Sequence, residues 1–269
     1  MKPLISIITV NLNNLTGLKK TVESVLDQSF KNYEYIVIDG GSNDGSKDYL
    51  KRKNEDIDYW ISESDRGIYD AMNKGIKRAK GKYLYFLNSG DWLYNSSVFS
   101  EVQKQLIDSD FIYGNLIKSF PNGDLKLDRG VAGKQINFQT FAEGTINHSA
   151  CFINRKMFQK YGLYDDTLKI VSDWKFFMIA LGLNNASISY IDIPIAYFDM
   201  TGISNNRFLR DNERQKVIEE VVPYPVYNTY LELIETRKKL NSYRYKKFEI
   251  TDNKIVSRKL HSLIFRLFS

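Results

Sequence analysis

A buried strand that ends in a carboxylate constrains this chain more than any other feature. Residues 82–91 read Lys-Tyr-Leu-Tyr-Phe-Leu-Asn-Ser-Gly-Asp, an apolar run that stops abruptly at small polar residues and Asp91. Such a run is typical of a strand inside a sheet that delivers its last side chain to the rim. In open α/β sheets, ligands bind beyond the carboxyl ends of the strands, where a carboxylate is placed to hold a divalent metal against phosphate oxygens. The sequence therefore predicts an α/β fold with a metal ligand at residue 91.

Strand and helix patterns alternate over the first 91 residues. The strand patterns lie at Leu4–Val10, Tyr35–Ile38, Asp58–Ile61 and Lys82–Leu87, with one helix capped by Thr16 and another at Ile68–Ala79 stopped by Gly81. This alternation predicts a parallel, doubly wound sheet.

Beyond Asp91 the pattern is looser. Strands are expected at Asp110–Gly114, Ser149–Ile153, Ser187–Ile191 and Ile195–Phe198, and a helix capped by Ser172 runs to Gly182. From Arg207 the pattern is helical, with a break around Pro223 and Pro225. We expect an α/β domain over residues 1–205, divided into halves at 1–91 and 92–205, and a helical extension over 206–269.

Composition limits the location of the protein. At 43% hydrophobic residues the 269-residue chain can bury a sizeable core. No apolar run reaches the roughly 18 residues that span a bilayer, and the N-terminus does not have the pattern of a secretory signal. The single cysteine, Cys151, fits a reducing compartment. We expect a cytoplasmic protein.

The positive charge is concentrated near the C-terminus. Residues 237–269 contain ten Lys/Arg and two Asp/Glu, a net charge of +8, which leaves −2 for residues 1–236 out of the total of +6. Nucleic-acid binding requires cations spread over the folded body, so a nucleic-acid partner is not expected.

The end of the chain has the pattern of a basic amphipathic helix. An apolar stripe recurs at helical spacing among four cations: Val256, Leu260, Leu263, Ile264 and Leu267 beside Lys254, Arg258, Lys259 and Arg266. One interpretation is binding to an anionic membrane surface through residues 237–269. The other is packing of the stripe on the catalytic domain or on a second subunit.

Four polar loops fall at the predicted carboxyl ends of strands, at residues 11–14, 39–42, 65–67 and 88–91. Each loop alone could be an ordinary turn, but four along one edge indicate a ligand site. The loop after the first strand lacks the G-x-G-x-x-G pattern of dinucleotide-binding enzymes and the Walker pattern of P-loop proteins. The loop at Asp39 is not an EF-hand, because Leu50 stands where the bidentate Glu is required.

Together these residues resemble a known family. The stretch Ile5–Asp91 resembles the donor-binding half of a family-2 glycosyltransferase with the GT-A fold, and the similarity continues to Ser204, covering residues 3–205. The matching pieces are residues 6–13 (SIITVNLN), 37–46 (VIDGGSNDGS), 65–75 (DRGIYDAMNKG), 86–91 (FLNSGD), 148–150 (HSA), 172–174 (SDW) and 198–204 (FDMTGIS).

The resemblance implies an activity and its site residues. It implies a metal-dependent, inverting glycosyltransferase that moves a sugar from a nucleotide-diphospho-sugar donor to a hydroxyl of a glycan or lipid-linked glycan, in cell-envelope polysaccharide synthesis at the inner face of the membrane. Asp91 would ligate Mg²⁺ or Mn²⁺, and Asp173 would act as general base. The donor would contact Val10, Asn11, Leu12, Asp39, Asp65, Asn73, Asn88, Ser89 and Gly90. Among these, Asp39 would accept from the nucleobase ring N–H. Two further donor contacts are expected from side-chain chemistry: Arg66 could pair with a phosphate, and His148 could touch the donor phosphates or the metal.

The chain departs from the family pattern at three positions. Asp39-Gly40 stands where Asp-Asp is frequent, and residues 88–91 carry one carboxylate where the family often has more. Mg²⁺ takes one or two protein carboxylates plus substrate phosphates, so one carboxylate is enough in principle. Leu12 replaces an aromatic residue of the base pocket, which leaves the base identity open.

Four of these residues also have ordinary structural interpretations. Asp173 is in the first turn of a helix, where carboxylates are common because of the helix dipole. His148 could be a partly buried core histidine, and Arg66 a surface residue in a turn. Trp174, which could stack on an acceptor sugar, could equally belong to the core.

Two other function classes remain. A non-catalytic nucleotide-sugar or glycan-binding partner of an assembly complex would fit the loop at residues 88–91, which has fewer carboxylates than the family often has there. A nucleotidyltransferase would require a Gly-rich loop with Arg or Lys after the first strand, where this chain has Asn11–Asn14.

Overall fold

The computed structural model describes residues 2–105, 108–202 and 206–268, without the side chains of residues 265, 267 and 268. The chain divides into two compact units, residues 1–214 and 215–269. The domain boundary expected at residue 205, and the end of the family resemblance at Ile203 and Ser204, fall on residues 203–205, outside the described part. That boundary therefore stays a prediction.

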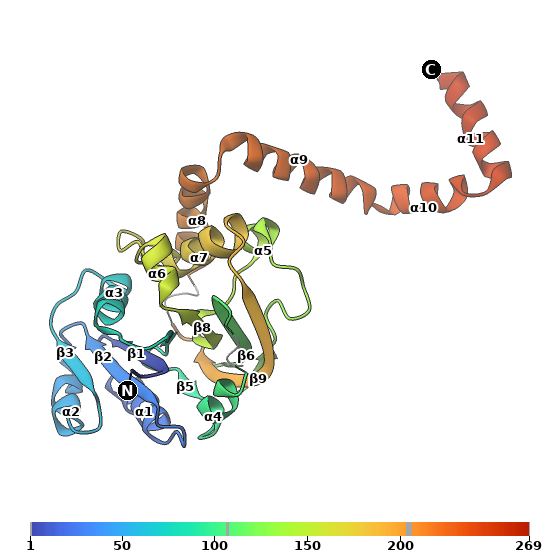
Figure 1. Ribbon diagram of the computed structural model, residues 1–269. Coiled ribbons are helices and arrows are strands. Elements are labelled where there is room, and N and C mark those ends of the chain that lie inside the picture. The colour runs from blue at the N-terminus through green and yellow to red at the C-terminus, as the bar shows by residue number, and fades with distance from the viewer. Residues whose placement is uncertain (1, 106–107, 203–205, 269) are drawn as a thin grey trace. The chain divides into compact units, whose positions relative to one another are not determined.

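The first unit is built on one mixed sheet (Figure 1). Within the described residues the sheet has nine strands, in the order β3-β2-β1-β4-β8-β6-β9-β5 with β7 paired to β6. The strands are β1 Ile5–Asn11, β2 Tyr33–Asp39, β3 Tyr59–Ser62, β4 Tyr83–Phe86, β5 Trp92–Leu93, β6 Phe111–Ser119, β7 Leu125–Asp128, β8 Cys151–Asn154 and β9 Ile188–Asp199.

The N-terminal half of the sheet is parallel, as predicted. β1 pairs in parallel with β2 and β4, and β2 with β3. The register sets Asn11 beside Asp39 and Asp39 beside Ser62, so three polar side chains meet at one edge. β1 is buried along its whole length, which explains its unbroken β-branched run.

Helices cover both faces of this half of the sheet, with α1 and α2 on one face and α3 on the other (Figure 1). The helices of the first unit up to β9 are α1 Leu15–Leu26, α2 Ser46–Arg52, α3 Ile68–Arg78, α4 Val98–Gln103, α5 Phe138–Glu143, α6 Lys156–Tyr161 and α7 Ser172–Phe177. A 3₁₀ turn at His148–Ala150 precedes β8, and a π-helix, Met178–Leu183, continues α7.

Three helix-end predictions were wrong. Asn14, rather than Thr16, caps α1, and its side chain accepts from Gly17 N at 3.0 Å. Ser172 does not cap α7, because the preceding residue occupies the cap position and the buried Ser172 hydroxyl finds no partner among the described residues. Gly81 does not end α3, which stops at Arg78; its lack of a side chain instead allows β1 to approach, because a Cβ there would lie 2.6 Å from Ser6 N.

The C-terminal half of the sheet mixes both directions. β8 lies antiparallel between β4 and β6, while β9 runs parallel to β6. The two strands predicted at Ser187–Ile191 and Ile195–Phe198 form the single strand β9. Its register with β6 shifts around Asn115, so the strand passes Pro194 without ending.

The second unit is helical. α8 Arg207–Val221 spans its boundary, and α9 Tyr224–Leu240, α10 Tyr243–Asp252 and α11 Ile255–Phe268 follow. The stripe predicted on the last helix lies on α11 and is exposed, with Val256 82% and Leu263 60% accessible; the side chain of Leu267 is outside the described part. In the described portion of the chain, no helix combines the length and apolarity needed to cross a bilayer.

Candidate active site

A hydrogen-bonded carboxylate, Asp39, sits at the edge where β1, β2 and β3 end. One oxygen accepts from Asn11 Nδ2 at 2.7 Å and from the Ser42 hydroxyl at 2.6 Å. The other accepts from Ser42 N at 3.0 Å and from the Ser62 hydroxyl at 2.6 Å. Burial raises the pKa of Asp39, but the bonds from Ser42, Ser62 and Asn11 outweigh it and hold the pKa below its usual value. The carboxylate is ionised, and its four donors occupy the four acceptor directions of its oxygens.

The neighbouring surface brings together two residues of the predicted donor pocket, Leu12 and Asp65. A Cβ at Gly40 would lie 2.5 Å from Asp65 Oδ2 and 3.3 Å from Leu12 Cδ1, so Gly40 is where these two side chains converge. Leu12 is 57% exposed, whereas Val10 is buried in the sheet. Asp65 accepts from Gly67 N at 2.9 Å, and burial raises its pKa. The loops that follow the first three strands therefore meet, as the sequence predicted.

Asp91 is almost fully buried, 4% exposed, at the end of the loop after β4. Its Oδ2 accepts from the Ser149 hydroxyl at 2.8 Å and its Oδ1 from Asp199 N at 2.9 Å. Burial raises the pKa of Asp91 to about 6, against these hydrogen bonds and the charge of His148, which lower it. Gly90 has φ +107°, a conformation that favours glycine and turns Asp91 inward.

A second carboxylate, Asp199 at the end of β9, lies beside Gly90 and Asp91. Its Oδ2 is 3.5 Å from where a Cβ on Gly90 would be, and its charge contributes to raising the pKa of Asp91. The Asn88 side-chain oxygen in the same loop is buried, and no described residue donates a hydrogen bond to it. Oxygen atoms of this kind are the ligands that Mg²⁺ and Mn²⁺ prefer, so these residues fit a divalent cation. Within the described residues there is no cluster of three or more His, Cys, Asp or Glu side chains suited to a metal.

Asp173 lies in the first turn of α7 and is joined to this loop through His148. One Asp173 oxygen is 3.1 Å from His148 Nδ1, and the other accepts from the Tyr69 hydroxyl at 2.9 Å. The Nε2 of the same imidazole is 3.2 Å from Asn88 Nδ2. A polar chain therefore runs from α3 through Asp173 and His148 to the loop that ends at Asp91.

The charges along this chain support one another. Burial raises the pKa of Asp173, but the hydrogen bond and charge of His148 and the bond from Tyr69 hold it below its usual value. Burial lowers the pKa of His148, but the hydrogen bond to Asp173 and the charges of Asp173 and Asp91 together more than compensate, so that pKa is raised. Asp173 is therefore an ionised carboxylate whose two oxygens are fixed by neighbours. Such a group is able to accept a proton from a substrate hydroxyl.

Trp174 follows Asp173 but belongs to the core. It is 2% exposed, and its Nε1 donates to Phe141 O at 2.9 Å and lies 3.1 Å from Gly144 O. The burial favours the core interpretation of this residue over stacking on a sugar. Sugar contact remains an untested prediction.

Three other predicted donor residues are engaged within the protein. Asn73 is buried and ties α3 to Tyr164, donating to its carbonyl at 2.8 Å and accepting from its N–H at 3.0 Å. Arg66 is exposed and pairs with Asp70 and Asp166. Ser89 is held by its backbone, since its N–H donates to the Val10 carbonyl of β1 at 3.0 Å. Contacts of these residues with a donor remain predictions.

Sequence reasoning missed several residues of the site. Asp199 and Ser149 hold Asp91, Tyr69 holds Asp173, and Thr21 holds the loop after β4 by accepting from Gly90 N at 3.1 Å. Tyr69, Ser149 and Asp199 all lie inside segments that resemble the family, and that position was the only available signal. Thr21 lies on the buried face of α1, and its position in the sequence indicates only a core residue.

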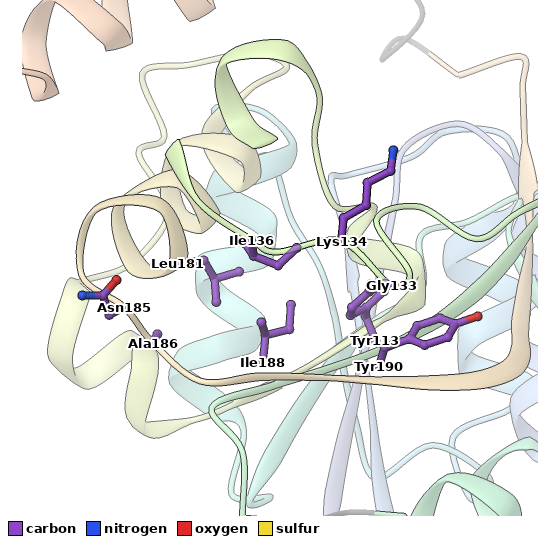
Figure 2. A pocket seen from close by; sticks show the side chains of 9 residues that line it. All are labelled: Tyr113, Gly133, Lys134, Ile136, Leu181, Asn185, Ala186, Ile188 and Tyr190. Atoms are coloured by element: carbon purple, nitrogen blue, oxygen red, sulfur yellow. The ribbon is translucent and has the colours of Figure 1, made fainter. Parts of the chain in front are cut away.

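A separate cavity of about 330 Å³ lies on the C-terminal half of the sheet (Figure 2). Tyr113 and Tyr190 form one wall, and Lys134 and Ile136 from the loop before α5 lie opposite. None of the site residues predicted from the sequence lines this cavity.

Solved structures share the fold. TarS of S. aureus matches with a TM-score of 0.62 at 18% identity, over 74% of this chain and 37% of that one. The mannosyltransferase PcManGT from Pyrobaculum calidifontis, solved with GDP-Man and Mn²⁺, matches with a TM-score of 0.61 at 12% identity, over 98% and 88% of the two chains. Together with the mixed sheet, these likenesses define a GT-A fold, as the sequence predicted.

Sequence comparison defines the family. The model for glycosyl transferase family 2 matches residues 6–162. An uncharacterised glycosyltransferase of Mycobacterium tuberculosis is 32% identical over 224 residues, which cover 76% of this chain and 78% of the relative. A PGL/p-HBAD biosynthesis glycosyltransferase of Mycobacterium bovis is 28% identical over 214 residues, with 76% and 80% covered. The chain belongs to glycosyl transferase family 2, which confirms the resemblance.

Proposed function

We propose that this protein is an inverting glycosyltransferase that uses a nucleotide-diphospho-sugar and a divalent cation. The observation that carries the proposal is the polar chain that links a buried carboxylate, Asp91, through Asn88 and His148 to a second ionised carboxylate, Asp173. One end suits a cation and diphosphate, and the other suits a base. Solved relatives of the same fold were captured with UDP-GlcNAc or with GDP-Man and Mn²⁺.

In this proposal the loop after β4 holds the metal. Asp91 and Asp199 supply carboxylate oxygens and Asn88 an amide oxygen, while Ser149 and Thr21 keep the loop in place. When bound, Mg²⁺ or Mn²⁺ would offset the negative charge on the departing diphosphate. Leu12, Gly40 and Asp65 form the surface on which the nucleoside would lie. A nucleobase N–H would reach Asp39 only by replacing one of its four donors.

Asp173 is the general base of the proposed reaction. Its carboxylate would take the proton of an acceptor hydroxyl as that oxygen attacks the anomeric carbon, on the face opposite the diphosphate. A single displacement of this kind inverts the anomeric configuration. Tyr69 and His148 fix both oxygens of Asp173, so the base needs no rearrangement before it acts.

The acceptor proposed is a glycan or lipid-linked glycan of the cell envelope. The name of the Mycobacterium bovis relative places that protein in PGL/p-HBAD biosynthesis. The exposed apolar stripe of α11, flanked by cations, would hold the enzyme at an anionic membrane surface.

A thermal-shift screen tests donor and metal together. Purified protein is heated with UDP-, GDP- and dTDP-sugars, each with Mn²⁺, with Mn²⁺ plus chelator, and alone. One nucleotide series should raise the melting temperature, and the chelator should remove most of the effect. Equal shifts with and without metal would rule out the metal site at Asp91.

A turnover assay distinguishes an enzyme from a non-catalytic binding partner. The second possibility is suggested by the small number of carboxylates in residues 88–91. An enzyme releases nucleoside diphosphate from its donor, at least slowly, with water as acceptor. Asp173→Asn should lose this turnover and keep the thermal shift. Protein that is stabilised by a donor but turns over none of the tested sugars would favour the non-catalytic alternative.

A further inference from the structure

Arg214, on α8 beside the proposed base, is a cation that the described part of the chain leaves unpaired. Among the described residues, no oxygen accepts a hydrogen bond from its guanidinium, and no carboxylate pairs with it. Its Nε is buried and has no acceptor among those residues. A guanidinium has five N–H donors, and buried donors in proteins are almost always paired. An acceptor from outside the chain would supply what is missing.

The surroundings place this guanidinium next to the chemistry. Its carbon lies 4.9 Å from the ring centre of Trp174, the residue after Asp173. Burial and the neighbouring charge of Arg210 lower the pKa of Arg214, while Asp173 and Asp211 act in the opposite direction. Arg210 and Arg214 are four residues apart, so they share one face of α8. Of these two cations, Arg210 pairs with Asp211 at 3.0 Å, and Arg214 has no such partner within the described residues.

The position of Arg214 is fixed by the residue before it. The buried Glu213 carboxylate accepts from Lys169 N at 2.8 Å and from Ile170 N at 2.9 Å. The Ile170 carbonyl in turn accepts from the Tyr69 hydroxyl at 2.6 Å. This part of α8 is thus tied to the same loop that presents Asp173, and Arg214 is held in place before any ligand arrives.

We propose that Arg214, assisted by Arg210, binds an acidic group of the acceptor, a phosphate or a carboxylate, beside the hydroxyl that Asp173 deprotonates. The inference rests on the proposed function, because Asp173 faces the acceptor only if it is the base. In an inverting displacement, the base and the leaving diphosphate lie on opposite sides of the anomeric carbon. A cation next to the base is therefore on the acceptor side, and a guanidinium suits planar, bidentate recognition of both acids.

This subsite would select acceptors by charge. A neutral glycan would leave the guanidinium unpaired, whereas an acidic one would satisfy it, so acidic acceptors would be favoured. The acid could be the phosphate of a lipid-linked acceptor or the carboxylate of a uronic acid. The two share the same recognition chemistry and are separated by the choice of probe.

Arginine-labelled protein allows a direct test by NMR of the Nε–Hε signals. The full chain is titrated with methyl phosphate, methyl glucuronide and neutral methyl glucoside, and the Arg214 signal is identified by its loss in Arg214→Lys and Arg214→Gln. We expect one or both acids to shift this signal, while the glucoside does not. The acid that acts at lower concentration identifies the source of the charge.

Matched variants complete the experiment. Arg210→Gln should weaken binding of the effective acid about tenfold, a factor that corresponds to roughly 1.4 kcal/mol. Arg52→Gln, a charge-matched change on the exposed face of α2, should leave binding unchanged. Chelator should also leave it unchanged, because the probe should not depend on a metal. An Arg214 signal that ignores both acids, or that responds equally to the glucoside, would overturn the proposal.

The result is independent of turnover. If the protein binds acids at Arg214 but transfers no sugar, the anion site is supported and the proposed catalysis is refuted. If the protein transfers sugar but Arg214 responds to neither acid, catalysis is supported and the anion subsite at Arg214 is refuted.

Discussion

At the scale of single residues, Asp91 is a carboxylate in an environment that opposes its ionisation. Asp91 is sealed from solvent with only two hydrogen bonds from the described residues, and its pKa of about 6 shows that ionisation is costly there. Asp39, also buried, has four donors and a lowered pKa. Asp39 is thus satisfied by its own chain, whereas Asp91 is left with fewer donors, as the proposed binding of a cation there requires.

The first prediction concerns the stability of the metal-free protein against pH. The folded pKa of Asp91 is raised above the ordinary 3.8, so its folded form binds more protons than the unfolded chain between about pH 4 and 6. Stability from this group is present at low pH and is lost as pH rises through about 6. Asp91→Asn should therefore gain relative to wild type on going from pH 4.5 to 7.5, by on the order of 1–3 kcal/mol.

Chemical denaturation with chelator at both pH values measures this gain. Asp56→Asn, an exposed change in the turn before β3, serves as control. A difference between Asp91→Asn and wild type that does not depend on pH would contradict a raised pKa at Asp91.

The second prediction concerns the pair of His148 and Asp173. His148→Gln leaves Asp173 buried without its cation, so the pKa of Asp173 should rise, and the acid limb of the donor-hydrolysis profile should move to higher pH. Breaking a buried pair should also cost about 3–5 kcal/mol of stability. A pH–rate profile and a denaturation curve measure these two effects. His261→Gln, in the tail, is the matched control; an unshifted acid limb in His148→Gln would show that His148 does not tune the base.

Among the elements, one loop and one helix position Asp173, the proposed base. Glu213 of α8 holds two backbone N–H groups of the loop before α7. Glu213→Gln keeps one acceptor oxygen and turns an NH₂ group toward the other N–H. We predict a loss of stability of about 1–3 kcal/mol and a fall in the rate of donor hydrolysis, with nucleotide binding unchanged. Glu219→Gln, an exposed change on the same helix, should have neither effect; nucleotide affinity that falls together with the rate would contradict a positioning role.

The strands and helix ends also show which parts of the fold could be predicted from the sequence. Strands β1, β2 and β4 were predictable because buried parallel strands are continuous apolar runs. The α1 cap was not, since Asn14 and Thr16 are both good caps and tertiary context decides between them. β9 was divided in the prediction because a proline ordinarily interrupts a strand, and here a register shift accommodates it.

Long-range contacts limited the prediction of the site. The strand-end loops were foreseeable because parallel strands end at one edge of a sheet. Asp199 approaches Asp91 across 108 positions, through strand pairing that no local pattern encodes. The contact of Glu213 with Ile170 crosses 43 positions in the same way.

Across the whole molecule, charge divides the chain. Residues 237–269 carry +8 and the preceding residues −2. The apolar stripe of α11 is exposed, with Leu260 57% accessible, while His261 stacks on Phe248 of α10 at 4.8 Å. Within the second unit, α10 thus covers one face of α11, and the stripe residues whose side chains the structure describes are exposed.

Flotation with liposomes tests the membrane interpretation. Each Lys or Arg near an anionic leaflet contributes about 1 kcal/mol, so changing Lys254, Arg258, Lys259 and Arg266 to Gln should reduce binding by roughly a hundredfold or more. Leu260→Ser with Leu263→Ser should weaken binding to anionic and neutral vesicles alike. If these variants bind vesicles normally but change oligomeric state or melting temperature, the stripe packs on protein instead.

The central proposal is an inverting displacement with Asp173 as the base, and the anomer first released from the donor is its sharpest test. Proton NMR follows hydrolysis of the donor selected by thermal shift, with Mn²⁺ present, before the free sugar equilibrates. From an α-linked donor we predict the β-sugar first, with turnover lost in Asp173→Asn and nucleotide binding kept. Initial release of the α-sugar, or unchanged turnover in Asp173→Asn, would contradict the mechanism.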